Sequence, residues 1–167
     1  MHGAPGDAKT SWLRSLPKKR TAVSGLFRDP LGRVLLLSRV YAPGWVLPGG
    51  IVEAGESPAS AFRREVAEEL GLDRAPGRIL CLDWVPGEQG PDLDGLVVVF
   101  DGGTLTREDI ASIRLPADEI GARHFVAPDG LPELPDLHRG ARVLACVRAW
   151  RENTALYLQN GSDRPAS

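Results

Sequence analysis

The chain has 167 residues, which is long enough for one domain with its own hydrophobic core. Its formal net charge of −2 gives no basic surface for duplex nucleic acid, and its 19 glycines and 14 prolines are too few to indicate disorder. No apolar run approaches the length of a membrane span, so we expect a protein without a membrane partner.

The two cysteines, Cys81 and Cys146, each lie inside an apolar run. The sequence gives no support for a disulfide between them, and we expect two buried thiols in a reducing compartment. The first ten residues lack the apolar core of a signal peptide. We therefore expect a cytoplasmic protein.

The chain is predicted to form a single domain over residues 11–158. Residues 1–10 are small, polar and turn-forming, so we expect a flexible N-terminal arm, and residues 159–167 are expected to form a flexible C-terminal tail. Ser11–Leu16 predicts a short helix before Pro17. Its Trp12 is expected to pack on the domain or on a partner subunit.

Strand signals follow this helix. Thr21–Phe27 alternates in polarity, Asp29–Gly32 is a strong turn signal, and Arg33–Ser38 predicts a buried returning strand. A loop then leads to a short strand at Trp45–Leu47.

Helix signals are strongest after Gly50. Ser57 suits the N-terminal cap of a helix, Pro58 its first position and Gly71 a left-handed cap at its end. Apolar residues recur there at spacings of three and four and so share one face: Ala59, Phe62, Val66 and Leu70.

Three glutamates occupy a neighbouring sector of this helix: Glu65, Glu68 and Glu69. Like charges at these spacings repel each other, so a positive group is expected to offset them. Carboxylate oxygens suit hard divalent cations such as Mg²⁺ or Mn²⁺. The alternative is a solvated acidic face with Arg64 as a local ion-pair partner. Glu69 favours the metal, because it lies at the edge of the apolar stripe.

The segment from Gly50 to Leu72 matches the Nudix box, Gly-x5-Glu-x7-Arg-Glu-U-x-Glu-Glu-x-Gly-U, in which U is a bulky aliphatic residue. Every fixed position is present: Gly50, Glu56, Arg64, Glu65, Glu68, Glu69 and Gly71. The chain therefore resembles the Nudix hydrolase family. This resemblance implies a loop–helix–loop that binds a divalent metal and hydrolyses a nucleoside diphosphate linked to another moiety.

The resemblance also implies roles for individual residues, carried over by position. Metal binding would fall to the carboxylates of Glu65, Glu68 and Glu69 and to the carbonyl of Gly49. The catalytic group would comprise Glu65, Glu68 and Arg64, with Glu65 either a ligand or the base and Arg64 orienting the carboxylates. Structural support of the box would come from Gly50, Glu56 and Gly71.

Three residues before the box are candidate substrate contacts: Arg39, Tyr41 and Trp45. Similar placements in the family favour a contact between Arg39 and a substrate phosphate, but a surface cation at a strand end explains Arg39 equally well. For Trp45, packing in the core is favoured over stacking on a base. The loops Tyr41–Gly44 and Pro86–Asp94 are expected to set substrate specificity.

Beyond the box, Arg78–Val85 and Gly95–Phe100 predict strands, and the second is apolar enough to be central in its sheet. Asp101–Gly103 is expected to end that strand in a turn. Thr106 suits the cap of a short helix that runs through Ile113, and a surface turn is the alternative for this segment.

Two further elements complete the domain. Glu119–Val126 predicts the last strand of the sheet, and Glu119 is a candidate additional carboxylate because the family often supplies one from outside the box. Leu137–Trp150 predicts a second major helix, whose first turn is weakened by Gly140. Its basic outer side is expected to be solvated rather than to meet acidic substrate groups: Arg139, Arg142 and Arg148.

Strands flanking two amphipathic helices predict an α/β or α+β sandwich, and the resemblance specifies the Nudix α/β/α sandwich with a mixed central sheet. The expected substrate is a small nucleotide-type diphosphate, such as a nucleoside triphosphate or ADP-ribose. The alternatives are a catalytically silent domain that senses a nucleotide and an isomerase of isoprenoid diphosphates. The intact box argues against the first, and the lack of a reactive cysteine against the second. A homodimer is compatible with the family, and no residue pattern decides it.

Overall fold

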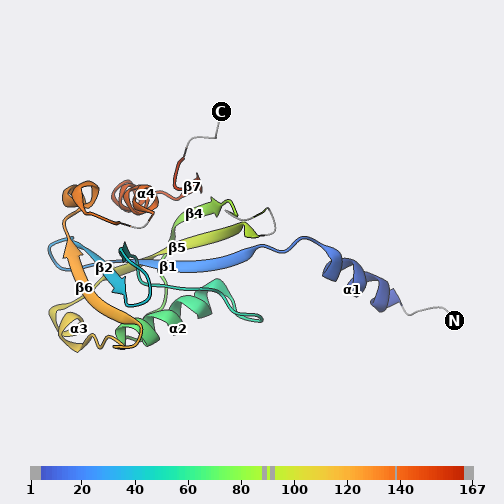
Figure 1. The fold of residues 1–167 in the computed structure, drawn as a ribbon, viewed down its shortest axis with the longest axis horizontal. Coiled ribbons are helices and arrows are strands. Elements are labelled where there is room, and N and C mark those ends of the chain that lie inside the picture. Colours follow the sequence, from blue (N-terminus) through green and yellow to red (C-terminus); the bar gives the residue numbers. More distant parts are fainter. Residues whose placement is uncertain (1–4, 88–89, 91–92, 138, 164–167) are drawn as a thin grey trace.

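A computed structural model describes residues 5–87, 90, 93–137 and 139–163. They form one mixed sheet of seven strands with helices on both faces, which confirms the predicted α/β/α sandwich (Figure 1). The strands are β1 (Arg20–Arg28), β2 (Val34–Arg39), β3 (Trp45–Val46), β4 (Ile79–Val85), β5 (Gly95–Thr104), β6 (Ile120–Val126) and β7 (Leu156–Gln159). The helices are α1 (Pro5–Ser15), α2 (Pro58–Leu70), α3 (Arg107–Ser112), the 3₁₀ helix η2 (Pro128–Glu133) and α4 (Gly140–Arg151).

The sheet has the strand order β3-β2-β1-β5-β4-β7, and β6 pairs with β2. Strands β1 and β5 are parallel neighbours at its centre, as predicted for Gly95–Phe100. The turn predicted at Asp101–Gly103 is wrong, because β5 stays paired with β1 as far as Thr104, across a bulge between Leu26 and Phe27. Strand β6 is not the last one either, since β7 pairs in parallel with β4.

Each face of the sheet carries its own hydrophobic core, because side chains alternate along the strands. On the face under α2, Phe62 stacks on Phe27 at 5.8 Å between ring centroids and meets Phe100 edge-on at 5.6 Å. On the opposite face, Leu26 and the next strand's Leu36 belong to the core under α4. The sheet thus holds the two helices on opposite sides of its central strands.

Helix α1 begins at Pro5, earlier than the predicted start at Ser11, and lies apart from the sheet (Figure 1). Trp12 is 59% exposed, so the expectation that it packs on the domain is wrong, while contact with a partner subunit stays a prediction. Within the described part of the chain, no helix combines the length and apolar character needed to cross a membrane.

The folded part extends past the predicted domain boundary at residue 158. The backbone N–H of Gly161 donates to the carboxylate of the buried Asp83 at 3.0 Å. Gln159 and Ser162 form an isolated antiparallel bridge. The contact with Asp83 fastens the segment after β7 to the neighbouring strand β4.

Candidate active site

The α2 helix begins and ends at the predicted residues. The hydroxyl of Ser57 accepts a hydrogen bond from the N–H of Ser60 at 3.1 Å, and Gly71 closes the helix in the left-handed conformation at φ 70°. Ala61 rather than the predicted Ala59 faces the core. This register puts Glu65 and Glu69 on the inner side of the helix and leaves Glu68 more exposed.

A glycine loop runs between strand β1 and helix α2. The N–H groups of Val23 and Gly25 donate to the carbonyls of Gly50 and Pro48 at 2.8 and 2.9 Å. Gly49 has φ +140°, and a Cβ there would lie 2.1 Å from the carbonyl oxygen of Val23; a Cβ on Gly50 would lie 2.3 Å from Oε1 of Glu65. Glycine at position 49 therefore lets the loop lie directly against β1, and glycine at position 50 lets it lie against the carboxylate of Glu65.

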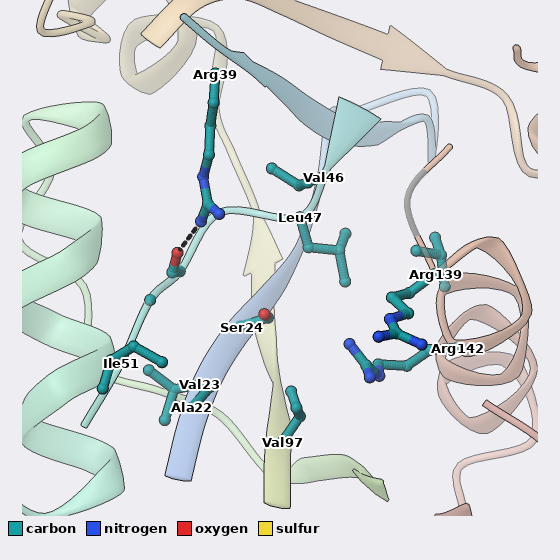
Figure 2. A pocket seen from close by; sticks show the side chains of 13 residues that line it. Ala22, Val23, Ser24, Arg39, Val46, Leu47, Ile51, Val97, Arg139 and Arg142 are labelled. Atoms are coloured by element: carbon teal, nitrogen blue, oxygen red, sulfur yellow. Dashed lines mark hydrogen bonds between the residues drawn. The ribbon is translucent and has the colours of Figure 1, made fainter. Parts of the chain in front are cut away.

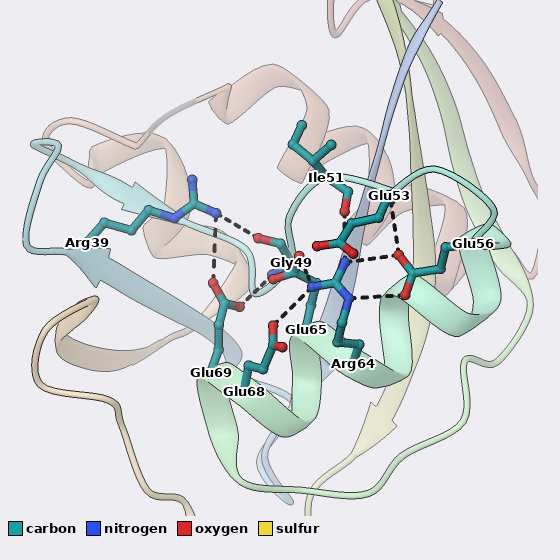
Figure 3. A network of polar contacts seen from close by, with 9 residues as sticks. All are labelled: Arg39, Gly49, Ile51, Glu53, Glu56, Arg64, Glu65, Glu68 and Glu69. Atoms are coloured by element: carbon teal, nitrogen blue, oxygen red, sulfur yellow. Dashed lines mark hydrogen bonds and ion pairs between the residues drawn. The ribbon is translucent and has the colours of Figure 1, made fainter.

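Glu69 is fully buried at the centre of the site (Figure 3). Its Oε2 accepts a hydrogen bond from the N–H of Gly49 at 2.7 Å, while its Oε1 lies 3.8 Å from Nη2 of Arg39 and accepts no hydrogen bond from the described residues. Burial raises the pKa of Glu69 to about 8, and the contacts with Gly49 and Arg39 only partly oppose that rise. The site thus holds a carboxylate whose negative charge is poorly compensated.

Arg64 ties the other carboxylates together (Figure 3). It donates two hydrogen bonds to Glu56, at 3.1 and 3.0 Å, and one each to Glu65 at 2.8 Å, Glu68 at 3.0 Å and the carbonyl of Ile51 at 2.9 Å. The bonds from Arg64 lower the pKa of Glu56. Burial raises the pKa of Glu65 despite its contact with Arg64. One guanidinium therefore offsets the repulsion among the carboxylates that surround it.

Glu119 lies half-buried just before β6, outside the box. Its charge contributes to the raised pKa of both Glu65 and Glu69, which places it within electrostatic reach of the two buried carboxylates. This position agrees with a further carboxylate of the site, and the role of Glu119 as a ligand or base stays a prediction.

The described residues contain no ready-made cluster of three or more histidine, cysteine or carboxylate side chains that could hold a metal ion. Glu65 and Glu68 are turned toward Arg64 instead. A positive group nevertheless already stands beside Glu69, because Nη2 of Arg39 contacts both that carboxylate and the Gly49 carbonyl, the latter at 2.7 Å. Carboxylate and carbonyl oxygens are the donors that hard divalent cations prefer. The residues present therefore fit such an ion.

A cavity of about 230 Å³ opens beside the glycine loop (Figure 2). Arg39 lies on one side of it, and Arg139 and Arg142 face it from the start of α4 on the other. The expectation of a solvated surface is therefore wrong for these two, whereas Arg148 pairs at the surface with Asp163 at 2.6 Å. One feature of the sequence could have indicated that Arg142 faces inward. It precedes the buried Cys146 by four residues and therefore lies on the same face of the helix.

Tyr41 and Trp45 are not among the residues that line this cavity. Tyr41 is exposed, and the guanidinium of Arg39 lies 5.9 Å from the centre of its ring. Trp45 packs against His124 at 5.6 Å between ring centroids and against the core under α4. Core packing, the favoured expectation for Trp45, agrees with this arrangement, and substrate contacts by either residue stay predictions. Residues 88–89 and 91–92 of the Pro86–Asp94 loop lie outside the described residues.

The family model of the NUDIX domain matches residues 18–155, so the chain belongs to the Nudix family, whose hydrolases generally use divalent metals. The crystal structure of the MutT protein from Methanosarcina mazei Go1 is 31% identical, with a TM-score of 0.67 over 83% of this chain and 99% of that one. An 8-oxo-dGTP diphosphatase of Haemophilus influenzae is 38% identical over 53 residues, 29% of this chain and 39% of that protein. Diphosphoinositol polyphosphate phosphohydrolase 2 of Rattus norvegicus is 42% identical over 64 residues, 38% of this chain and 36% of that protein. The chain thus spans less than half the length of these curated relatives.

Proposed function

We propose that the chain is a divalent-metal-dependent hydrolase that cleaves the phosphoanhydride bond of a nucleoside diphosphate linked to another moiety. The observation that carries this proposal is the state of Glu69, which is fully buried beside the Gly49 carbonyl with one oxygen that accepts no hydrogen bond from the described residues. Burying a poorly compensated carboxylate is unfavourable, and a bound cation would offset that cost.

The groups that would hold Mg²⁺ or Mn²⁺ are the carboxylates of Glu65, Glu68 and Glu69 and the carbonyl of Gly49. When bound, the metal neutralises diphosphate charge and lowers the pKa of a water molecule. Arg64 positions Glu65 and Glu68 and offsets their mutual repulsion. The glycine loop keeps its backbone within contact distance of the carboxylates, where a side chain would not fit.

The remaining polar groups suit binding and proton transfer. Arg39 lines the cavity next to Gly49 and is the proposed contact for a substrate phosphate, because a guanidinium matches phosphate oxygens in pairs. Glu65 is the proposed base, since burial raises its pKa toward the working pH, and Glu119 is the second candidate. Small nucleotide-type substrates are proposed, including nucleoside triphosphates and sugar nucleotides such as ADP-ribose.

The cysteines argue against an isomerase with a reactive thiol. Cys81 and Cys146 are both fully buried and face each other at 2.9 Å between sulfur atoms. The contact with Cys81 and burial together raise the pKa of Cys146, which disfavours the reactive thiolate. Two free thiols at this distance suit a reducing compartment, and the cytoplasm is our proposed location.

The test is product analysis after incubation with a nucleoside triphosphate, ADP-ribose and a dinucleoside polyphosphate, each with Mg²⁺ or Mn²⁺. We expect hydrolysis of at least one substrate, and loss of that activity in Glu68→Gln and Glu69→Gln with the fold retained. Glu108→Gln, on the exposed surface of α3, is the matched control and should leave activity unchanged. No products from the wild type, or full activity in both site variants, would contradict the proposal.

A further inference from the structure

The end of the cavity opposite Arg39 is basic and carries no aromatic ring. A second cavity of about 200 Å³ adjoins the first and shares Arg139 and Arg142 with it. Among the described residues that line the two cavities, none is acidic and none is aromatic. Arg20 also lines the second cavity, which adds a further cation at this end.

Arg142 is held in place by a buried carboxylate. Its Nε donates to Asp83 at 2.6 Å, and Asp83 is fully buried with its other oxygen bonded to the N–H of Gly161. Both Nη groups of Arg142 face the cavity and donate no hydrogen bond to a described residue (Figure 2). The ion pair therefore fixes the guanidinium and leaves four of its five N–H donors for a ligand.

Arg139 stands beside Arg142 at the first turn of α4 (Figure 2). Its backbone adopts φ 57°, a conformation uncommon for a residue with a side chain, and its Nη1 donates to the side-chain oxygen of Asn160 at 2.8 Å. Arg139 and Arg142 thus present two guanidinium groups on one wall of the cavity. Planar guanidinium groups match the oxygens of a phosphate in pairs.

This wall fits a phosphate better than a nucleobase. Proteins that bind an unpaired nucleobase commonly stack it on an aromatic side chain. Among the described residues that line the two cavities, none has an aromatic side chain. The apolar residues between the two ends suit the sugar or chain that joins two charged groups: Ala22, Leu47, Val97 and Val143.

We infer that Arg142, with Arg139 beside it, binds a phosphate group that the substrate carries in addition to its diphosphate. This inference rests on the proposed function, which puts the diphosphate at the opposite end of the cavity, near Gly49 and Arg39. The substrate class is then a diphosphate compound with a separate phosphomonoester, rather than a plain nucleoside diphosphate derivative.

Binding is tested first with ligands that contain no phosphoanhydride and are therefore not hydrolysed. Calorimetry with Mg²⁺ compares AMP with adenosine 3′,5′-bisphosphate and adenosine 2′,5′-bisphosphate. We expect at least one bisphosphate to bind about 10-fold more tightly than AMP, the amount that one charged hydrogen-bonded contact supplies. Equal affinities for all three in the wild type, or no binding of any, would overturn the inference.

Variants then locate the contact. Arg142→Gln should bring the ratio of the affinity for the bisphosphate to the affinity for AMP close to one. Arg148 lies on the same helix and pairs with Asp163 outside the cavity, so Arg148→Gln should leave this ratio unchanged. Because Arg142→Gln leaves Asp83 buried without its cation, the double variant Asp83→Asn/Arg142→Gln is measured beside it. A ratio that stays at the wild-type value in this folded double variant would also overturn the inference.

Hydrolysis separates this inference from the proposed function. Coenzyme A and dephospho-coenzyme A, and likewise NADPH and NADH, differ by one phosphomonoester outside the diphosphate. We expect a lower KM for the phosphorylated member of at least one pair, and Arg142→Gln should remove that difference. Cleavage of both members with equal KM overturns the inference alone. Preferential binding of a bisphosphate without hydrolysis of any diphosphate supports the inference and contradicts the proposed hydrolase.

Discussion

Arg39 and Glu69 form the ion pair at the centre of the site, with Nη2 of Arg39 lying 3.8 Å from Oε1 of Glu69. The same nitrogen donates to the carbonyl of Gly49 at 2.7 Å. The guanidinium thus stands between the two groups to which the proposed function assigns a metal. On the proposed function, a metal bound there would take the place of the Arg39 guanidinium beside Glu69.

Arg39→Gln removes this competing charge. We expect the Mg²⁺ concentration at half-maximal activity to fall several-fold, while KM for the diphosphate substrate rises about 10-fold because a charged hydrogen-bonding partner is lost. Steady-state kinetics over a matrix of metal and substrate concentrations measures both values. The idea fails if neither value changes relative to Arg33→Gln, a surface control that pairs with Asp29 in the β1–β2 turn.

Glu69→Gln separates stability from activity. The amide oxygen of glutamine can still accept the hydrogen bond from Gly49, and the buried charge is gone. At pH 8, without metal, we expect the free energy of unfolding to be higher than in the wild type, by up to about 4 kcal/mol. Activity with metal should fall at least about 100-fold. A variant that is both active and destabilised would contradict this account of Glu69.

Glu69 also predicts how stability depends on pH in the metal-free protein. Its pKa is about 8 in the folded state and 4.5 in its ordinary state, so the folded protein holds the proton more tightly. This contribution is complete below pH 4.5 and is lost as the pH rises through 8, a total on the order of 4 kcal/mol. Urea unfolding at pH 5, 6, 7 and 8 should show the wild type losing stability relative to Glu69→Gln. Parallel pH curves for the two proteins would rule this out.

Arg64 and its neighbour Arg63 give a matched pair on one helix. Arg64 bonds three carboxylates and a carbonyl, whereas Arg63 has one exposed partner, Asp73, at 2.8 Å. Arg64→Gln should lower the free energy of unfolding by about 2 kcal/mol and reduce activity, because Glu65 and Glu68 lose their shared partner. Arg63→Gln should stay within about 0.5 kcal/mol of wild type. Denaturant titrations measure both changes in the free energy of unfolding. Equal losses in the two variants would mean that the hydrogen bonds of Arg64 do not stabilise the fold.

Three glycines of the box region should respond differently to alanine. At Gly49 the new Cβ would meet the backbone of Val23, so we expect a loss of about 3 kcal/mol or more. At Gly50 it would meet only the end of the Glu65 side chain, so stability should change little while activity falls. Gly55 has φ +82° with nothing within 4 Å, and only backbone strain of about 1 kcal/mol is expected. Thermal melts measure the three losses of stability, and kinetics measure activity. A different ranking of the three variants would contradict this account.

Local signals made α2 predictable almost to the residue. Ser57 and Gly71 act on groups three or four positions away, so the caps can be recognised without knowledge of the rest of the fold. Strand β7 has four residues and only Leu158 fully buried, and it forms because β4 offers a free edge. Such a strand leaves no pattern in its own sequence.

The site, like the fold, has parts that could be predicted from local sequence and parts that could not. The acidic residues of the box could be identified from spacing, because the helix fixes their relative positions. The partners of Arg142 and Arg148 could not, since both arginines lie on one helix and only the surrounding fold directs one to buried Asp83 and the other to Asp163. Distant contacts thus decided which arginine lines the cavity.

The bond from Gly161 to Asp83 has a practical consequence for the end of the chain. Asp83 positions Arg142, and Asn160 accepts a hydrogen bond from Arg139, so both wall arginines depend on residues beyond the predicted boundary at 158. A protein trimmed at that boundary would keep the whole box and lose the bond from Arg139 to Asn160 and the bond from Gly161 to Asp83. On the proposed function, such a trimmed protein would keep hydrolase activity and lose part of its preference among substrates, which would make Asn160 and Gly161 remote determinants of selectivity.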